Sequence, residues 1–177
     1  MNKTIEGRRT ISQYPNCQVS NLGRDINIQY SRIIKCSKDS YGYCIVELRN
    51  EMGGKTFKVH WFVAQEFIEN DFDKAFVDHI DLDVGNNRVS NLRWATNEQN
   101  QMNRQSQVGS SSIYKGAVWD KDRNQWRTAI RSNKKILPLG LFNNGKDAAI
   151  AYNEKAIELF CEYAYVCEIS DEEQDED

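Results

Sequence analysis

Short segments in which apolar and polar residues alternate dominate the first third of the chain and predict a strand-rich N-terminal region. Residues 17–20, 25–30 and 43–48 are segments of this kind. The turn-forming residues at 21–23 and 38–42 separate them. We therefore expect a small antiparallel module at the start of the chain.

A strand and a helix are predicted next. Residues 55–59 alternate as a strand after a turn that contains two glycines. Residues 60–68 then place Trp61, Ala64 and Ile68 at helical spacing. The pattern indicates a hairpin that leads directly into a helix.

The middle of the chain predicts a unit of strand, loop, strand and helix. Residues 76–80 form a short apolar strand, a loop rich in Asp, Gly and Asn follows, and a second strand lies around residues 92–94. Thr96 and Gln99 form a capping-box pattern, which predicts a helix over residues 97–104 with Thr96 as its N-cap.

The last third predicts a separate sheet and helix. Residues 105–112 are polar and are interpreted as a linker. Residues 114–119, 125–131 and 134–141 predict a three-stranded meander. A helix should follow, with an N-cap and an apolar stripe formed by Asn144, Asp147, Ala149, Tyr152, Ala156 and Leu159.

The negative net charge of the chain comes from its last seven residues, and the rest of the chain is mildly basic. The 177 residues carry a formal net charge of −3, from 23 basic and 26 acidic side chains. Six of the acids lie in the last seven residues, so the rest of the chain has 23 bases against 20 acids. A mildly basic body suits a nucleic-acid partner. The acidic C-terminal segment cannot bury apolar surface, and we expect it to be disordered.

The composition restricts the class of protein, and the cysteine spacing indicates its cellular compartment. Apolar residues make up 40% and charged residues 28%, as in a globular protein, and every apolar stretch is too short for a membrane span. The five cysteines form no Cys-x-x-Cys pair and the N-terminus has no signal-peptide pattern. We expect a soluble intracellular protein with reduced thiols, no membrane contact and no structural zinc site.

A dense set of polar residues occupies the predicted strand–loop–strand–helix unit. Asp78 and His79 end a strand, Asn91 begins the return strand, and Asn100 lies in the first turn of the capped helix. Each residue alone has an ordinary explanation, because Asn often supplies turn geometry and a lone His is often structural. A calcium loop of the EF-hand type is excluded, since its sixth and twelfth positions would be Asn86 and Leu92 rather than Gly and Glu.

Taken together, the set resembles the HNH nucleases, in the branch of phage, intron and viral homing endonucleases whose last motif position is Asn. The matching residues are Val59 to Ala64, Phe67, Val77 to Asp81, Asn86, Asn87, Asn91 to Thr96 and Asn100. The resemblance implies a ββα-metal nuclease core and hydrolysis of a DNA phosphodiester bond.

The same resemblance implies the roles of the site residues. Asp78 and Asn100 would bind one divalent cation, Mg²⁺ or Mn²⁺, which prefer oxygen ligands. His79, neutral near pH 7, would act as general base on the attacking water. Side chain or backbone around Asn91 would orient the imidazole. The interpretation for His60 is a structural role, and for Asn86 and Asn87 the closing of the loop.

Two flanking segments also resemble DNA-binding modules. Residues 11–14 and 19–24 look like the nuclease-associated N-terminal module, although the usual Trp is missing and Gln13 stands where Gly is usual; a role in extending the DNA contact and a role in packing alone are both open. Residues 113 to about 165 resemble the plant APETALA and ethylene-response-factor domain, a three-stranded sheet backed by one helix. The matching residues are Tyr114 to Gly116, Trp119, Trp126 to Arg131, Leu139 to Phe142, Ala148, Ala149, Ala151 to Asn153 and Ala156.

Period two places Arg127 and Arg131 on the sheet face opposite the helix, and this face can meet DNA. Together with Lys115 they are the predicted DNA contacts, and Lys134 and Lys135 at the turn are expected to contact phosphates. The reading face of the plant domain carries Arg or Trp where this chain has other residues, so its base preference does not transfer; these positions are Val118, Ile136 and Pro138.

The sequence therefore predicts an α+β protein. We expect a module at 1–54, a nuclease core at 55–104, a linker at 105–112, a DNA-binding domain at 113–167 and an acidic tail at 168–177. The predicted function is a metal-dependent homing endonuclease that nicks double-stranded DNA as a monomer, without an obligate protein partner. The alternatives are a catalytically inactive, sequence-specific DNA-binding regulator and, less favoured, an RNA-binding protein.

Overall fold

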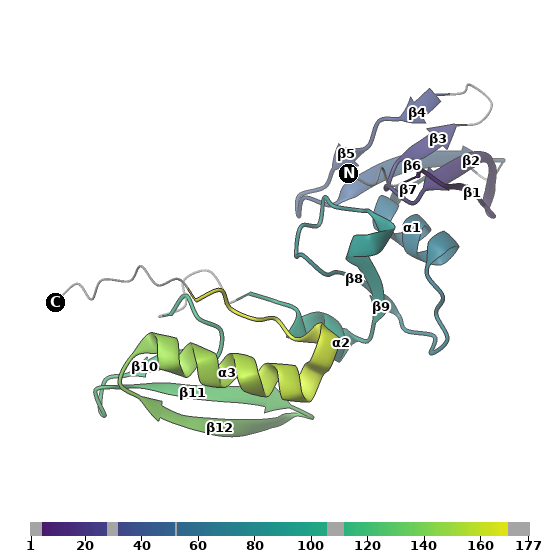
Figure 1. The fold of residues 1–177 in the computed structure, drawn as a ribbon. Helices are drawn as coiled ribbons and strands as arrows, with labels where there is room; N and C mark the ends of the chain where they lie inside the picture. The colour runs from purple at the N-terminus through teal and green to yellow at the C-terminus, as the bar shows by residue number, and fades with distance from the viewer. Residues whose placement is uncertain (1–4, 28–31, 52, 106–111, 170–177) are drawn as a thin grey trace. The chain divides into compact units, whose positions relative to one another are not determined.

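The computed structural model describes residues 5–27, 32–51, 53–105 and 112–169. The chain divides into two compact units, residues 1–100 and 101–177. The expected linker and acidic tail lie largely outside the described residues, as does the end of the strand predicted at 25–30. Figure 1 shows the order of the elements along the chain.

The first unit is built from small antiparallel sheets. One sheet has four strands in the order β1-β2-β3-β4, and a second has three strands in the order β5-β6-β7. The strands of these sheets are β1 Arg8–Ile11, β2 Tyr14–Ser20, β3 Asp25–Asn27, β4 Arg32–Ile34, β5 Ser37–Lys38, β6 Cys44–Asn50 and β7 Gly53–Lys58. The predicted strands at 17–20, 43–48 and 55–59 are present with slightly different ends, whereas β1, β4 and β5 were not predicted.

The elements that follow, of which α2 crosses the boundary between the two units, come in the predicted order. Helix α1 runs over Val59–Phe67, strands β8 (Phe76–His79) and β9 (Leu92–Ala95) pair with each other, and α2 covers Asn97–Met102. The capping box at α2 is confirmed, because the Gln99 N–H donates to Thr96 Oγ1 and the Thr96 N–H donates to Gln99 Oε1.

One hydrophobic core joins these elements. It combines side chains from the N-terminal strands, from α1 and from β9, so the strands before residue 54 and the segment after it are packed together. Its members are Ile11, Tyr14, Cys17, Val19, Cys44, Val46, Leu48, Val59, Phe62, Val63 and Leu92. The N-terminal strands therefore supply part of the apolar surface on which the β8–β9 hairpin depends. The predicted domain boundaries remain an interpretation.

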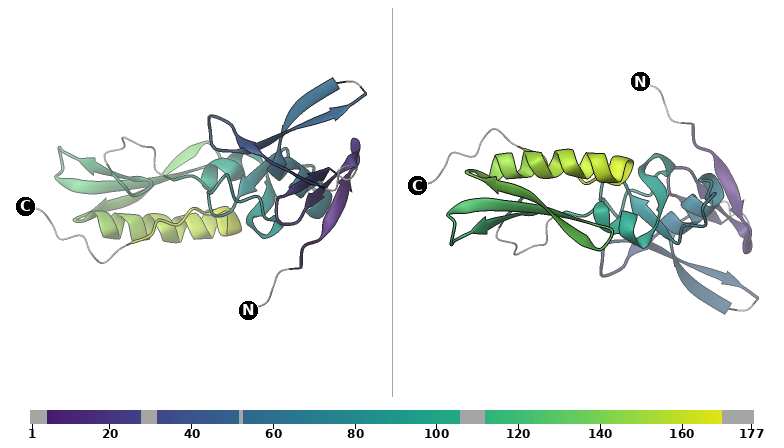
Figure 2. Two further views of the ribbon diagram at one scale, coloured as in Figure 1. Left: turned by 90° about the horizontal axis from the view of Figure 1, so that it is seen from above. Right: turned by 90° about the horizontal axis from the view of Figure 1, so that it is seen from below.

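The second unit is a three-stranded antiparallel sheet with one long helix. The strands lie in the order β10-β11-β12, and α3 lies along one face of this sheet (Figure 2). The elements are β10 Ala117–Asp120, β11 Gln125–Ser132, β12 Lys135–Phe142 and α3 Gly145–Phe160. The predicted meander and helix are present. The first strand begins at Ala117 rather than at residue 114, because Gly116 takes a positive φ of 78° there and turns the chain.

Alternation along β11 decides which side chains meet the helix. Thr128 and Ile130 are buried, whereas Arg127 and Arg131 are exposed on the opposite face, as predicted. A bulge in β12 skips one residue between the partners of Thr128 and Ala129, which places Leu137 and Leu139 against the same cluster as Ile130. The sheet therefore has one apolar face under α3 and one open face.

The N-cap of α3 gives a test of this unit. The Asn144 side chain accepts a hydrogen bond of 2.8 Å from the Asp147 N–H, as the sequence pattern predicts. We expect Asn144→Ala to lower the free energy of opening of the α3 amides by about 1 kcal/mol, measured by hydrogen exchange. The adjacent variant Asn143→Ala removes an exposed side-chain bond to Gln125 and serves as the control. Equal protection in both variants would contradict the capping role.

Candidate functional site

Two predicted site residues lie side by side at the end of a strand. His79 is the last residue of β8, Asp78 precedes it, and both side chains are buried, at 5% and 4% exposure. Neighbouring strand residues face opposite sides, so both can be buried only because each side of the hairpin is covered at this point. The chain then turns sharply at Leu82, whose φ is 67°. The expected placement at a strand end is present.

Asp78 is paired with a basic residue on the neighbouring strand. Asp78 and Arg93 are register partners in the β8–β9 hairpin. The Arg93 Nε and Nη2 groups both donate to Asp78 Oδ2, at 2.8 and 2.7 Å, and little of either side chain is exposed. Two bonds to a single oxygen fix the orientation of the carboxylate. Sequence reasoning missed this pair, although two opposite charges at facing strand positions are a signal for it.

The imidazole of His79 is held by an amide. Its Nε2 lies 3.1 Å from Asn87 Oδ1, and Asn87 is itself buried. Since an amide oxygen only accepts, Nε2 carries the hydrogen and Nδ1 carries the lone pair. The basic nitrogen of His79 is therefore Nδ1.

Burial keeps this imidazole neutral. The pKa of His79 is lowered from its usual value, because burial disfavours the charged ring. The bond to Asn87 and the nearby carboxylates of Asp81, Asp78 and Asp83 oppose this shift in part. A ring that is neutral at pH 7 can accept a proton, and the carboxylates around it stabilise the cation that forms.

Two further rings pack against His79. His60, on α1, meets it edge to face with the ring centroids 4.9 Å apart, and Tyr43 lies 5.9 Å from it. The Lys58 ammonium stands 3.7 Å above the Tyr43 ring. These contacts leave the imidazole little room to rotate about its side-chain bonds.

Burial, together with the neighbouring His79 and Lys58, lowers the pKa of His60 to about 3. Among the described residues, its Nδ1 is the buried side-chain nitrogen or oxygen that lacks a hydrogen-bond partner. A neutral ring that packs against the site agrees with the structural role expected for it.

Asn91 binds the loop between the two strands. Its Oδ1 accepts from the Asp81 N–H at 3.0 Å, and its Nδ2 donates to Asp81 Oδ1 and to the Asn86 carbonyl at 2.8 and 2.9 Å. Its main-chain carbonyl accepts from the Ile80 N–H, directly after His79. Asn91 thus acts on the backbone beside His79, while the imidazole itself is bound by Asn87, whose contact with the ring was not predicted.

The remaining predicted metal ligand, Asn100, lies half-buried in α2, where its N–H donates to the Thr96 carbonyl at 3.0 Å. Asp78 and Asn100 offer only oxygen donors, which fits Mg²⁺ or Mn²⁺. Within the described ranges, no three His, Cys, Asp or Glu side chains are grouped as a metal cage. A cation here would take most of its ligands from water and substrate, as Mg²⁺ commonly does.

Four of the predicted DNA contacts are exposed on the second unit. Arg127 and Arg131 project from the open face of β11. Lys134 and Lys135 lie at the exposed turn between β11 and β12, where Asn133 and Lys134 take positive φ values of 50° and 63°.

Lys115 differs from these residues. Its Nζ donates to the Met102 carbonyl at 2.7 Å and lies 5.5 Å from the centre of the Tyr165 ring. Burial lowers its pKa to about 8. The structure therefore gives Lys115 an internal partner, and we leave it out of the DNA-contacting set proposed below. Gly116 turns the chain before β10 begins, so Lys115 lies outside β10, although a strand was predicted over residues 114–119.

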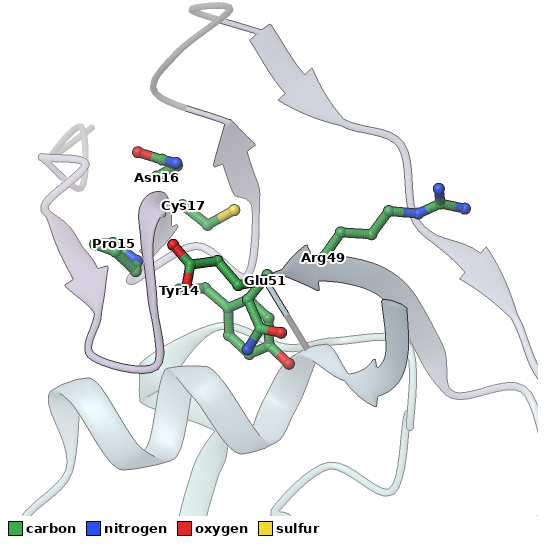
Figure 3. Close-up of a pocket in the computed structure, with 7 residues that line it drawn as sticks. Tyr14, Pro15, Asn16, Cys17, Arg49 and Glu51 are labelled. Carbon is green, nitrogen blue, oxygen red and sulfur yellow. The ribbon is translucent and has the colours of Figure 1, made fainter. Parts of the chain in front are cut away.

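A separate pocket lies at one end of the N-terminal sheets. It has a volume of about 490 Å³ and is lined by residues of β2 and the β6–β7 hairpin (Figure 3). None of the predicted site residues lines it. The Arg49 side chain extends away from the other labelled residues in Figure 3, and its guanidinium pairs with Glu47.

The depressed pKa of His60 makes stability depend on pH. The pKa of the His60 ring is about 3 in the folded protein and about 6.5 in the unfolded chain. Between these two pH values the unfolded chain therefore binds more protons than the folded protein. The contribution is fully present above pH 6.5 and is lost as the pH falls. We expect urea unfolding to show about 3 kcal/mol less stability at pH 4 than at pH 7 from this residue alone. The variant His60→Phe should lose this part of the slope, and identical slopes in the two proteins would contradict it.

Comparisons with known proteins point to one family for this site. Residues 69–102 match the family model described as HNH endonuclease. The matched segment contains Asp78, His79, Asn91 and Asn100.

Over the described residues, no helix is long and apolar enough to cross a membrane.

Two curated relatives carry the same type of domain. The DNA endonuclease I-HmuI of Bacillus phage SP01 is 37% identical over 111 residues, which cover 61% of this chain and 62% of that protein. An uncharacterized HNH endonuclease of Acanthamoeba polyphaga mimivirus is 32% identical over 85 residues, or 48% of this chain and 26% of that protein. The chain thus spans less than two thirds of the length of either relative.

One solved structure is similar to this chain in both fold and sequence. The structure described as DNA binding and cleavage by the HNH homing endonuclease I-HmuI matches with a TM-score of 0.51 at 35% identity, over 54% of this chain and 55% of that one. The several small sheets and few helices are similar to the HNH endonuclease fold. Residues 69–102 thus match the HNH endonuclease family, and the chain is similar in sequence and fold to part of the phage homing endonuclease I-HmuI.

Proposed function

We propose that the protein is a metal-dependent DNA endonuclease of the HNH homing type, which hydrolyses a phosphodiester bond and leaves a nick. The observation that carries the proposal is the buried, neutral His79, whose Nε2 is held by Asn87 and whose neighbour is the carboxylate of Asp78. The homology to a phage DNA endonuclease supports the same reaction.

His79 is the general base in this proposal. Its Nδ1 takes a proton from the water that attacks the phosphorus atom. The ring becomes a cation at that moment, and the Nε2–H bond to Asn87 strengthens because its donor is then charged. The negative charge of Asp81 and Asp78 stabilises the same cation.

Asp78 and Asn100 would hold the divalent cation, Mg²⁺ or Mn²⁺. When bound, the cation would neutralise charge on the scissile phosphate and on the departing 3′ oxygen. Arg93 contributes by fixing the Asp78 carboxylate through Oδ2. Asn91 acts through the backbone after His79, so its loss should reduce the rate more than it reduces binding.

Double-stranded DNA is the proposed substrate, and the second unit is the proposed recognition domain. Arg127 and Arg131 on the open sheet face contact the DNA, and Lys134 and Lys135 contact phosphates. The resemblance of this unit to the APETALA and ethylene-response-factor domain supports the assignment. One active site per chain acting as a monomer would cut one strand.

A catalytically inactive DNA-binding regulator is the second candidate function. It is favoured by the open basic face of β11, which would bind DNA whether or not the site at His79 cleaves it. The presence of Asp78, His79, Asn91 and Asn100 together in the matched segment argues for cleavage.

Plasmid cleavage tests the reaction. We expect the wild-type protein to convert supercoiled plasmid to the nicked form with Mg²⁺ or Mn²⁺ at low salt, and to leave it intact in EDTA. The variant His79→Ala should lose at least about 100-fold in rate, the usual contribution of a general base, while DNA affinity stays unchanged. If the wild-type protein binds DNA but never cuts it with either metal, the regulator function replaces the nuclease. Linear product as the first species would show that both strands are cut.

DNA affinity tests the recognition face. Arg127→Ala and Arg131→Ala should each weaken binding to double-stranded DNA and reduce the slope of log affinity against log salt by about 1, if each contacts one phosphate. A base-specific contact would instead lower affinity for the preferred site by about 1–3 kcal/mol. Lys146→Ala, on α3, is the matched control for loss of one charge. Equal effects at all three positions would contradict a role for the open face.

A further inference from the structure

The turn that ends β2 is held in one conformation by its own hydrogen bonds. Residues 20–24 form it, with the Gly23 N–H donating to the Ser20 carbonyl at 2.9 Å and the Ser20 N–H donating to the Arg24 carbonyl at 2.9 Å. The fully buried Ser20 hydroxyl accepts from the N–H groups of Leu22 and Arg24. The turn is therefore a rigid element rather than an adaptable loop.

Asn21 fastens this turn on two sides. Its side chain accepts from the Gly7 N–H at 3.0 Å and donates to the Ile5 carbonyl at 3.1 Å. Its main-chain carbonyl accepts from the Val89 N–H at 2.9 Å. The turn is thus bonded at once to the start of the chain and to the loop that leads from His79 to β9.

Gly23 touches the same loop two residues earlier, at Asn87. A Cβ atom at Gly23 would lie 2.5 Å from Asn87 Cβ, 2.8 Å from its carbonyl oxygen and 2.9 Å from its carbonyl carbon. The φ of Gly23 is +74°, in the left-handed region that favours glycine. Two of the three atoms it would meet belong to the backbone, so no side-chain rotation could relieve the contact. Glycine is required here because the turn and the loop are in direct contact.

The contact has a consequence for the imidazole, because Asn87 is the residue that holds it. Asn87 Oδ1 binds His79 Nε2 at 3.1 Å and sets which ring nitrogen is basic. A shift of the Asn87 backbone by a few tenths of an ångström would lengthen or misalign this bond.

We propose that the turn at residues 20–24 is a positioning element for His79, with Gly23 and Asn21 placing Asn87 so that the imidazole is held with Nδ1 facing the substrate. The inference rests on the proposed nuclease function for its kinetic test, but the placement of the ring can be measured without cleavage. It gives the N-terminal segment a role in the chemical step, separate from any contact with DNA.

Substitution at Gly23 tests the proposal against a matched control. Gly23→Ala should lower the single-turnover cleavage rate at least tenfold and leave DNA affinity in EDTA within twofold of wild type. Gly53→Ala is the control, because Gly53 also has a positive φ, of +117°, in a hairpin of the same unit, but a Cβ there would meet nothing within 4 Å. It should cleave within twofold of the wild-type rate. Gly23→Asn, in which the side chain tolerates the left-handed region better, tests the same contact if the alanine variant folds poorly.

Coupling to Asn87 separates positioning from general damage. In an Asn87→Ala background the bond to the ring is already lost, so adding Gly23→Ala should change the rate less than twofold. Independent, multiplicative losses in the double variant would overturn the proposal. So would equal rates for Gly23→Ala and Gly53→Ala.

The nitrogen resonances of the imidazole give a readout that does not need activity. The chain has two histidines, so a His60→Phe background leaves His79 as the single imidazole in a ¹⁵N spectrum. We expect one tautomer, with the proton on Nε2, in the parent and in Gly53→Ala, and a mixture of tautomers in Gly23→Ala. An unchanged spectrum in Gly23→Ala overturns the proposal. If no protein cleaves DNA but the spectra differ as expected, the nuclease assignment fails and the positioning role stands.

Discussion

The hydrogen bond between His79 Nε2 and Asn87 Oδ1 is the contact on which the rest of the site depends. In the resting state both groups of this hydrogen bond are neutral. The bond becomes stronger when the ring takes up a proton, because its donor is then charged. A buried imidazole without this partner could carry its single hydrogen on either ring nitrogen. The bond removes that choice, and the hydrophobic core of the first unit keeps Asn87 and His79 in place around it.

The two carboxylates near the His79 ring, those of Asp78 and Asp81, have different hydrogen-bond partners. Asp78 is bound by Arg93 through one oxygen, which holds it in one orientation beside the strand end. Asp81 is instead surrounded by the amides of Asn86 and Asn91, whose hydrogen bonds lower its pKa against the effect of burial and keep it ionised. The charges of both carboxylates raise the pKa of a ring whose pKa burial lowers. In the proposed reaction, this negative charge would stabilise the cation that forms on the ring, so little rearrangement would be needed in that step.

Local patterns predicted the elements of this chain better than they predicted its contacts. The capping residues Thr96 and Asn144 and the alternation along β11 are properties of neighbouring residues, and the structure confirms them. The pairing of Asp78 with Arg93 depends on the register of a hairpin, and the approach of Gly23 to Asn87 joins segments more than 60 positions apart. Neither is a property of a short window of sequence. Lys115 is a related case, because the turn at Gly116, with its positive φ, leaves this residue outside β10 although a strand was predicted over residues 114–119.

The open face of the second unit constrains how it could read DNA. Arg127 stands between Val118 and Leu141 on the neighbouring strands, and Arg131 stands beside Ile136. All three aliphatic side chains are exposed, between 42% and 70%. Aliphatic groups on such a face can contact thymine methyl groups and sugars, but they form no hydrogen bonds to base edges. Discrimination between bases would therefore fall on the two arginines, while the lysines of the β11–β12 turn would add affinity without sequence preference. A face of this composition favours a target that tolerates substitution at many positions, which is the kind of site a homing endonuclease would use.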